Sequence, residues 1–236
     1  FHGARAERII VSARTSGAVG EADGISLFLL ARETPGLSLR PYPTIDGLRA
    51  AEVSLTEASG ELLGAEGQAQ GIIECVIDSA IIAVCAEAVG IMQTLNAMTR
   101  AYVDSRKQFG VAIGKFQVLQ HALVDMYMAH ELSKSLTYRA AGAAATADAQ
   151  GRARAASATK VQIGKAGKLI GEQAVQLHGG MGMTDELAVG HYFKRLAMIE
   201  TLFGNTDHHR RRFARLSAAE EPRIHRQHRI GRRRQL

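Results

Sequence analysis

Three stretches of the sequence combine residue types that could bind a charged or planar ligand. The first covers residues 106–117 and contains Arg106, Phe109 and Gln117 around two glycines. An arginine presents a planar fork of N–H donors that suits phosphate oxygens, and a glutamine amide can pair with the edge of a sugar or heterocycle. A structural alternative stays open, because a cation at the C-terminus of a helix also complements the helix dipole.

The second stretch, residues 176–183, reads QLHGGMGM and follows an expected helix. Gly179 and Gly180 have no Cβ, so the backbone can approach a ligand closely, and successive amides can form an anion-binding concavity. It is not a Rossmann-type fingerprint, because it follows a helix and not a strand. The structural alternative is a helix C-cap, with His178 as a hydrogen-bonded structural histidine.

The third stretch, residues 203–210, reads FGNTDHHR and lies between the last two expected helices. Asn205 or Thr206 can cap the final helix. His208 and His209 are neighbours, and adjacent residues of a helix point in different directions, unlike the i, i+4 pairs that bind zinc. No metal site is therefore predicted.

The positive charge of the chain is concentrated at its C-terminal end. The formal net charge is +6, and residues 217–236 hold six arginines against Glu220 and Glu221. This segment accounts for +4 and leaves +2 for the rest, an ordinary value that does not favour nucleic-acid binding. A basic segment with few apolar residues is typical of a disordered tail.

The sequence shows no obvious membrane span or targeting segment. No run of 18 uninterrupted apolar residues occurs, and the first residues, FHGA, contain neither an initiator Met nor an apolar signal region. We therefore expect a cytoplasmic protein without membrane contacts, whose sequence begins inside a domain. Cys75 and Cys85 fall on one expected helix about 15 Å apart, too far for a disulfide, so both are predicted to be buried free thiols.

The elements that must position these stretches change character near residue 62. Short branched apolar runs at 9–11, 25–30 and 51–55 predict strands, separated by glycine-rich or Pro-Gly segments. So few strands cannot close a sheet, and an open edge is a liability. Residues 1–62 are therefore interpreted as part of a larger middle β-domain.

Residues 63–216 show helical periodicity. A first helix is expected over about 68–106. After an interruption at 110–114, a second is expected from its apolar spacing between Leu119 and Leu136, ending in the Ala/Gly-rich patch at 140–151. The third begins near Arg152 and stops at the 178–180 glycine motif, with Ile163 and Ile170 inward and Lys160, Lys165, Lys168 and Glu172 outward. A fourth over about 186–200 and a short fifth to about residue 216 complete the set. The predicted fold class is α+β: an antiparallel four-helix bundle preceded by part of a β-barrel or sheet domain.

In this order, the motifs resemble those of the acyl-CoA dehydrogenases. The resemblance rests on RKQFG at 106–110, FQ at 116–117 and QLHGGMG at 176–182, followed by a helix that ends before a Gly-centred loop. It covers residues 7 to about 216. Residues 42–53 and 190–195, together with TLFG at 201–204, resemble the small subunit of the pimeloyl-CoA dehydrogenase type.

The resemblance implies an N-terminal helical domain, a middle β-domain and a C-terminal four-helix domain, with FAD between the last two and extending across a subunit interface. Six residues match family positions that contact the FAD of a neighbouring subunit: Arg106, Phe109, Gln117, Gln176, Gly179 and Gly180. The arginine is implied to meet the pyrophosphate, the next two to lie beside the adenosine portion, and the last three to contact the cofactor through amide and backbone.

Two departures from the family pattern concern catalysis. The first helical domain and the segment that binds the isoalloxazine ring are not in this sequence. In the family, a carboxylate removes a proton from the acyl α-carbon while the β-hydride passes to flavin N5. The usual glutamate position holds Phe203 and the alternative position holds Ala80, and neither can accept a proton. A positioned base contributes about 10²–10⁴-fold, so the identity of the base is left open.

Nearby acids are weak candidates for that base. Glu200 lies three residues before the usual position, where a helix-end or ion-pairing role is the alternative. Glu74 and Asp78 flank the alternative position, and Asp78 should face away from it. Asp207 occupies the place of a polar residue that contacts the flavin in the family.

The favoured hypothesis is a subunit of a heteromeric FAD-dependent acyl-CoA dehydrogenase whose homologous large subunit supplies the carboxylate. Such an enzyme would oxidise the α,β bond of an acyl-CoA thioester, of a dicarboxylic or otherwise bulky acid, and pass electrons to electron transfer flavoprotein. Two alternatives stay open. One is a catalytically silent assembly subunit, and the other is a homomeric dimer or tetramer that uses an atypical acid.

Overall fold

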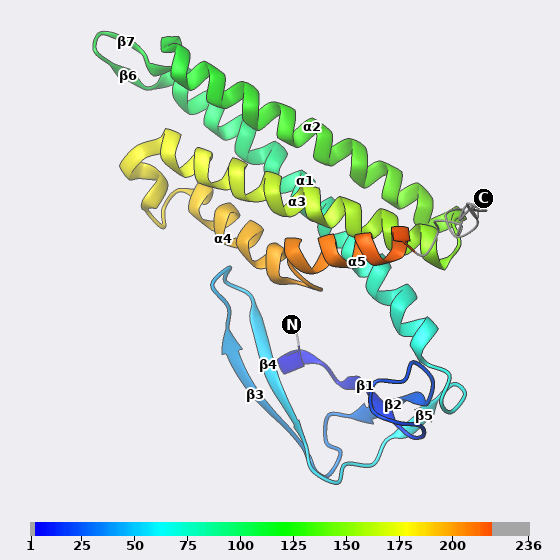
Figure 1. Ribbon diagram of the computed structural model, residues 1–236. Coiled ribbons are helices and arrows are strands. Elements are labelled where there is room, and N and C mark those ends of the chain that lie inside the picture. The colour runs from blue at the N-terminus through cyan, green and yellow to red at the C-terminus, as the bar shows by residue number, and fades with distance from the viewer. Residues whose placement is uncertain (1–2, 219–236) are drawn as a thin grey trace, which may run out of the picture.

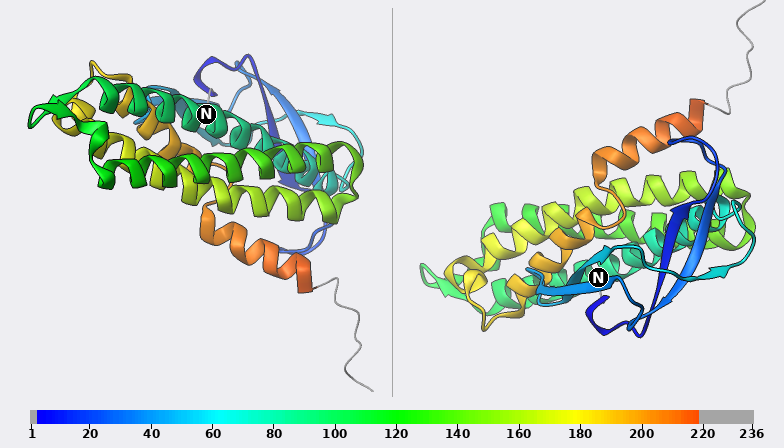
Figure 2. Two further views of the ribbon diagram at one scale, coloured as in Figure 1. Left: turned by 90° about the horizontal axis from the view of Figure 1, so that it is seen from above. Right: turned by 90° about the horizontal axis from the view of Figure 1, so that it is seen from below.

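The computed structural model describes residues 3–218 (Figures 1 and 2). Its N-terminal part is β-rich, as predicted. Strands β1 (Arg8–Arg14), β2 (Ile25–Ala31) and β5 (Glu61–Leu63) form an antiparallel sheet in the order β1-β2-β5. Strands β3 (Leu37–Pro43) and β4 (Arg49–Leu55) form a separate antiparallel hairpin. The polar, proline-containing β3 had not been expected, because its apolar alternation is weak.

A bundle of helices follows the strands. The helices are α1 (Gln70–Ser105), α2 (Gln117–Thr146), α3 (Ala149–His178), α4 (Ala188–Thr201) and α5 (Thr206–Ala218). Shorter pieces connect them: the two-residue strands β6 (Lys107–Gln108) and β7 (Val111–Ala112), and 3₁₀ turns at Ile113–Lys115 and Gly179–Met183. A further 3₁₀ turn, Gly3–Arg5, precedes β1. The predicted helices are confirmed, although α4 has only 14 residues and is less than half as long as α1 to α3.

Helix α3 is the centre of the bundle and packs against α1, α2, α4 and α5. Its buried face alternates small and branched residues, among them Ala156, Ile163, Gly167 and Ile170. Small side chains let neighbouring helices approach, and the branched ones fill the space between them. The core that results is formed by residues of α1, α2, α3 and α4.

Two expectations about side-chain burial are wrong. Lys160 was expected on the outer face of its helix with Lys165 and Lys168, yet it is fully buried while the other two are exposed. Cys85 is buried as expected, but Cys75 is exposed, and both are free thiols. The predicted disordered tail begins inside α5, and its residues beyond Ala218 lie outside the described part of the chain.

Within the described residues, α1 is the one helix that is long and apolar enough to cross a membrane by length and composition. This is weak evidence for a membrane span, because a core helix of a bundle meets the same criteria. About 44% of the apolar window of α1 is buried inside the protein, where α1 packs on α2, α3 and α4.

Candidate functional site

The first two sequence motifs meet at one end of the bundle (Figure 1). Helix α1 ends just before Arg106, and the β6–β7 turn then leads into α2 at Gln117. Helix α3 ends beside this turn, where the ring of His178 stacks on Tyr102 of α1 with ring centroids 4.5 Å apart. The stacking brings the 176–180 loop next to the 106–117 turn, although the two are far apart in sequence.

All six predicted cofactor residues, including Gln117 and Gln176, are exposed at this end. The ring of Phe109 is 91% exposed, and its φ of 52° is a left-handed conformation that bulky residues rarely adopt. A Cβ added at Gly179 or Gly180 would meet no heavy atom within 4 Å, so the space above this backbone is open. No acidic side chain within residues 3–218 pairs with Arg106. The cluster faces outward, toward a ligand or another chain.

This arrangement fits one part of a large anionic cofactor. An unpaired guanidinium suits phosphate oxygens, an exposed ring suits a planar heterocycle, and open glycine backbone permits close approach. FAD offers a pyrophosphate and an adenine ring, so the residues present are compatible with its adenosine-diphosphate portion. Their individual contacts with FAD stay a prediction.

His178 has a structural role, as the structural interpretation of the second motif expected. It is buried, and its Nδ1 lies 2.7 Å from the carbonyl oxygen of Ala174, to which it donates. The helix ends immediately after it, at Gly179, whose φ is 60°. The motif is therefore both a helix C-cap and the edge of the open cluster.

The third motif forms the loop between α4 and α5, and the residue at its centre is Phe203. This residue has a φ of 56° and a side chain that is 43% exposed. Gly204 follows with a φ of 103°, and a Cβ there would lie 2.6 Å from the ring of His208. Asn205 caps α5 as predicted, because its Oδ1 accepts a hydrogen bond of 2.9 Å from the backbone N–H of His208.

Buried Lys160 lies beneath this loop. Its Nζ donates to the carbonyl of Glu200 at 3.0 Å and to that of Gly204 at 2.8 Å. Burial lowers the pKa of Lys160 from its usual value, and the nearby carboxylate of Glu200 partly opposes this effect. Helical periodicity assigns Lys160 to an outer position because it cannot anticipate a loop that folds back over α3 and offers two acceptors.

His209 forms a hydrogen bond to the same loop from the other side. It is fully buried, and its Nε2 donates to the carbonyl of Phe203 at 3.1 Å, while Nδ1 faces the hydroxyl of Ser157 at 3.3 Å. Burial lowers the pKa of His209 to about 4, and the positive charges of Lys160 and Arg212 add to the shift. The imidazole is therefore neutral at pH 7.

Glu200 is a helix-end residue in this structure. Its Oε1 accepts a hydrogen bond of 2.8 Å from the backbone N–H of Thr206, at the start of α5. Its Oε2 is buried and has no hydrogen-bond partner within the described residues. The carboxylate thus supports the helix junction, which agrees with the alternative that the sequence left open.

The other acids considered as bases are also engaged locally. Asp78 is 1% exposed and pairs with Arg212 at 2.7 Å and Arg152 at 3.6 Å. Glu74 is exposed and accepts a hydrogen bond from the side-chain amide of Gln70, and Asp207 pairs with Arg210 of its own helix. Since each carboxylate has a local partner, none of them stands out as a free base.

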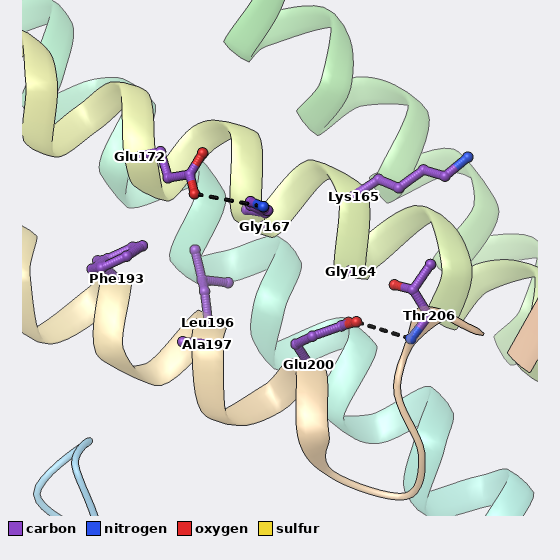
Figure 3. Close-up of a pocket in the computed structure, with 10 residues that line it drawn as sticks. Gly164, Lys165, Gly167, Glu172, Phe193, Leu196, Ala197, Glu200 and Thr206 are labelled. Carbon is purple, nitrogen blue, oxygen red and sulfur yellow. Dashed lines mark hydrogen bonds and ion pairs between the residues drawn. The ribbon is translucent and has the colours of Figure 1, made fainter. Parts of the chain in front are cut away.

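A pocket of about 440 Å³ opens between α3, α4 and the start of α5 (Figure 3). Gly164 and Gly167 form its α3 wall, and Phe193 and Leu196 form its α4 wall, with Glu200 at one end. A Cβ on Gly164 would lie 2.1 Å from Oε2 of Glu200. The pocket is shaped by glycines on α3, and it does not coincide with the six predicted cofactor residues.

Sequence reasoning missed the role of Arg195. Its guanidinium binds both carboxylate oxygens of Glu87 at 2.6 and 2.8 Å and Oδ2 of Asp46 at 2.7 Å. Asp46 lies in the β3–β4 turn and its side chain is fully buried. The two subgroup stretches at 42–53 and 190–195 contain this pair, but no local pattern indicates that residues so distant in sequence meet.

The family described as "Acyl-CoA dehydrogenase, C-terminal domain" matches residues 72–217. The short-chain specific acyl-CoA dehydrogenase of Clostridium acetobutylicum is 31% identical over 87% of this chain and 55% of its own length. The human mitochondrial short-chain specific enzyme is 29% identical over 86% of this chain and 50% of its own length.

Among solved structures, the one described as "FAD complex of PigA" superimposes with a TM-score of 0.84 at 25% identity, covering 92% of this chain and 57% of that chain. The chain spans about half the length of these curated relatives. The family match includes every helix of the bundle except the first two residues of α1 and the last of α5. This chain belongs to the acyl-CoA dehydrogenase family.

Proposed function

We propose that this chain is part of an FAD-dependent acyl-CoA dehydrogenase that oxidises the α,β bond of an acyl-CoA thioester. When bound, FAD supplies the hydride acceptor for that reaction. The observation that carries the proposal is the open cluster at the end of the bundle, where Arg106 has no acidic partner among residues 3–218 and the backbone of Gly179 and Gly180 is uncovered. Family membership and the FAD complex of a structural neighbour support the choice of cofactor.

The six residues of the cluster would hold the FAD of a neighbouring subunit. Arg106 would pair with the pyrophosphate, and Phe109 and Gln117 would lie beside the adenosine portion. Gln176, Gly179 and Gly180 would approach the same cofactor with amide and backbone groups. The outward orientation of all six is what a site completed by a second chain requires.

The outer face of α2 supports a second chain in the assembly. Large apolar side chains are exposed along this helix: Val118, Val124, Tyr127, Met128, Leu132 and Tyr138. Monomeric proteins rarely leave large apolar patches in water. We infer that another subunit covers this face, so that the interface and the end-of-bundle cluster form together.

The catalytic base would come from a homologous large subunit. Phe203 and Ala80 occupy the positions where the family resemblance places a base, and Glu200 is committed to the N-terminus of α5. The subgroup resemblance to the pimeloyl-CoA dehydrogenase small subunit favours this heteromeric arrangement. The enzyme would act in the cytoplasm and, as the family resemblance implies, pass its electrons to electron transfer flavoprotein. A catalytically silent assembly subunit and a homomeric enzyme with an atypical acid are the competing proposals.

The decisive test is FAD content and acyl-CoA bleaching of the assembled protein with and without Arg106. Charge-assisted hydrogen bonds contribute about 1.5–3 kcal/mol, so Arg106→Ala should weaken FAD binding by about 10- to 100-fold. Arg100→Ala is the matched control, since Arg100 is an exposed arginine in the last turns of α1, which ends just before Arg106. Flavin absorbance and FAD titration give the readout.

The outcomes separate the three proposals. Loss of FAD in the Arg106 variant alone, together with acyl-CoA bleaching only when a homologous partner is present, supports the heteromeric enzyme. Equal FAD content in both variants would leave the silent assembly subunit. Bleaching by the single chain at ordinary rates would require an acid of this chain as base, to be identified by replacing Glu200 first.

A further inference from the structure

Two buried side chains, Lys160 and His209, donate hydrogen bonds to the backbone of the loop between α4 and α5. Three carbonyl groups around the turn accept hydrogen bonds: those of Glu200 and Gly204 from Lys160, and that of Phe203 from His209. Both donors have no exposed surface. The loop is therefore anchored to α3 on one side and α5 on the other.

Burying a charged donor and straining the loop backbone both cost free energy, which indicates that this loop conformation has a functional role. A buried ammonium loses its hydration and is tolerated only when its donors are satisfied. Phe203 also adopts a φ of 56°, which strains a bulky residue, and such strain persists only where the surroundings determine it. Strained backbone held by buried polar groups is found preferentially at functional sites.

These hydrogen bonds do not involve the side chain of Phe203. Its only described hydrogen bond to the buried donors is through the carbonyl, and its ring is 43% exposed. Gly204 next to it cannot carry a side chain, because a Cβ would strike the His208 ring at 2.6 Å. The loop therefore fixes the place of residue 203 while leaving its side chain free to be exchanged.

We propose that Lys160 and His209 are positioning residues that make the α4–α5 loop a rigid platform for the side chain at position 203. The platform is independent of which side chain it carries. This chain would then hold a phenylalanine on a platform able to present a carboxylate. The inference about catalysis rests on the proposed function, but the inference about rigidity does not.

Rigidity can be measured directly, because the chain contains no tryptophan. Phe203→Trp places a single indole on the loop, and its fluorescence anisotropy and emission maximum report local mobility. Adding Lys160→Met should lower the anisotropy and shift the emission to the red, since two carbonyls lose their donor. Lys165→Met is the matched control: it removes an exposed lysine from the same helix and should change neither signal.

A second variant guards against misfolding of the Lys160 protein. His209→Phe keeps a ring of similar size but removes the donor to the Phe203 carbonyl, and circular dichroism reports whether each variant is folded. Folded variants in which the indole at position 203 becomes mobile support the platform. An unchanged anisotropy in folded Lys160→Met and His209→Phe proteins would overturn it.

The inference about catalysis is tested in the assembled enzyme with the substitution Phe203→Glu. Acyl-CoA-dependent flavin bleaching at this subunit should rise by about 10²-fold or more over Phe203→Gln, the range expected for a positioned base. Adding Lys160→Met should lower kcat by about 10²-fold with KM little changed, as for a misplaced catalytic group. No gain from Phe203→Glu, with the indole signals behaving as expected, would overturn the inference about catalysis and leave both the rigid platform and the proposed function standing.

Discussion

His209 occupies a buried position between α3 and the α4–α5 loop, where its two ring nitrogens face the Phe203 carbonyl and the Ser157 hydroxyl. Loss of hydration disfavours its charged form, and Lys160 beside it disfavours it further. Lys160 is subject to the same desolvation, and two of its three N–H donors are satisfied by loop carbonyls. Single residues thus connect the helix core to the loop that carries Phe203.

The lowered pKa of His209 predicts a pH dependence of stability. The pKa is about 4 in the folded protein, against 6.5 for an unperturbed histidine, so the unfolded chain binds a proton first as the pH falls. The free energy of unfolding should therefore decrease between about pH 6.5 and pH 4, by up to about 3 kcal/mol. Urea denaturation at a series of pH values measures it.

His209→Gln should remove most of that slope, because glutamine does not titrate. His208→Gln is the control, since His208 is the exposed neighbour on the same helix. A His209→Gln protein that retains the full slope would show that other groups cause the acid sensitivity.

At the scale of elements, glycines on α3 determine how closely α4 and α5 approach. Gly164 faces Glu200 and Thr206, and Gly167 faces Leu196 of α4 (Figure 3). A Cβ at Gly164 would lie 2.1 Å from Oε2 of Glu200, whereas one at Gly167 would meet Leu196 at an ordinary 3.6 Å. The two glycines are on one helix but differ in the space beside them.

This difference predicts opposite effects of the same substitution. Gly167→Ala should stabilise the protein by about 0.5–1 kcal/mol, because alanine is the better helix former and fits. Gly164→Ala should destabilise it by about 1–3 kcal/mol, since the new methyl group displaces the carboxylate that caps α5. Chemical denaturation of the two variants gives both values, and a stabilised Gly164→Ala protein would contradict the packing shown here.

The contact between the β3–β4 hairpin and the helices depends on one arginine. Arg195→Met would leave the buried carboxylate of Asp46 without its cation, which should destabilise the protein by about 3 kcal/mol. Arg40→Met removes an exposed ion pair to Glu52 within the hairpin and should have little effect. Hydrogen exchange of residues 44–48 should accelerate in the Arg195 variant only. Equal protection in both variants would mean that other contacts hold the hairpin.

At the scale of the whole molecule, the described residues expose the end-of-bundle cluster and an apolar face of α2. The two surfaces are linked through α2, because Gln117 of the cluster is its first residue, while Gln176, Gly179 and Gly180 come from the end of α3. If one subunit interface covers both, assembly and FAD binding must be linked.

That linkage predicts that a change which disrupts the subunit interface also reduces FAD binding. Met128→Glu with Leu132→Glu places two charges on the apolar face and should lower both the oligomer mass and the FAD content, while leaving the helical signal unchanged. Ala141→Glu introduces a charge at another exposed position of α2 and should alter neither. Light scattering and flavin absorbance measure the two quantities, and a dissociated protein that keeps its FAD would separate the interface from the cofactor site.

The sequence alone determined the helices, the strand-to-helix transition near residue 62 and the six residues that now lie together at one end of the bundle. These features follow from local periodicity, from helix-stopping glycines such as Gly179, and from motifs whose order resembles one family. The helix cap at Asn205 and the structural role of His178 were also accessible, because their partners lie within a few residues.

Tertiary structure decided the burial of Lys160, the pairing of Arg195 with Asp46 and Glu87, and the left-handed conformation of Phe203. Each depends on groups that meet only after distant segments pack, such as the two loop carbonyls that accept from Lys160. Periodicity reports which face of a helix is apolar, but it does not report which acceptors a neighbouring loop brings to that face. A buried cation is stable only where such acceptors satisfy it, and for that reason the platform under Phe203 became visible only in the folded chain.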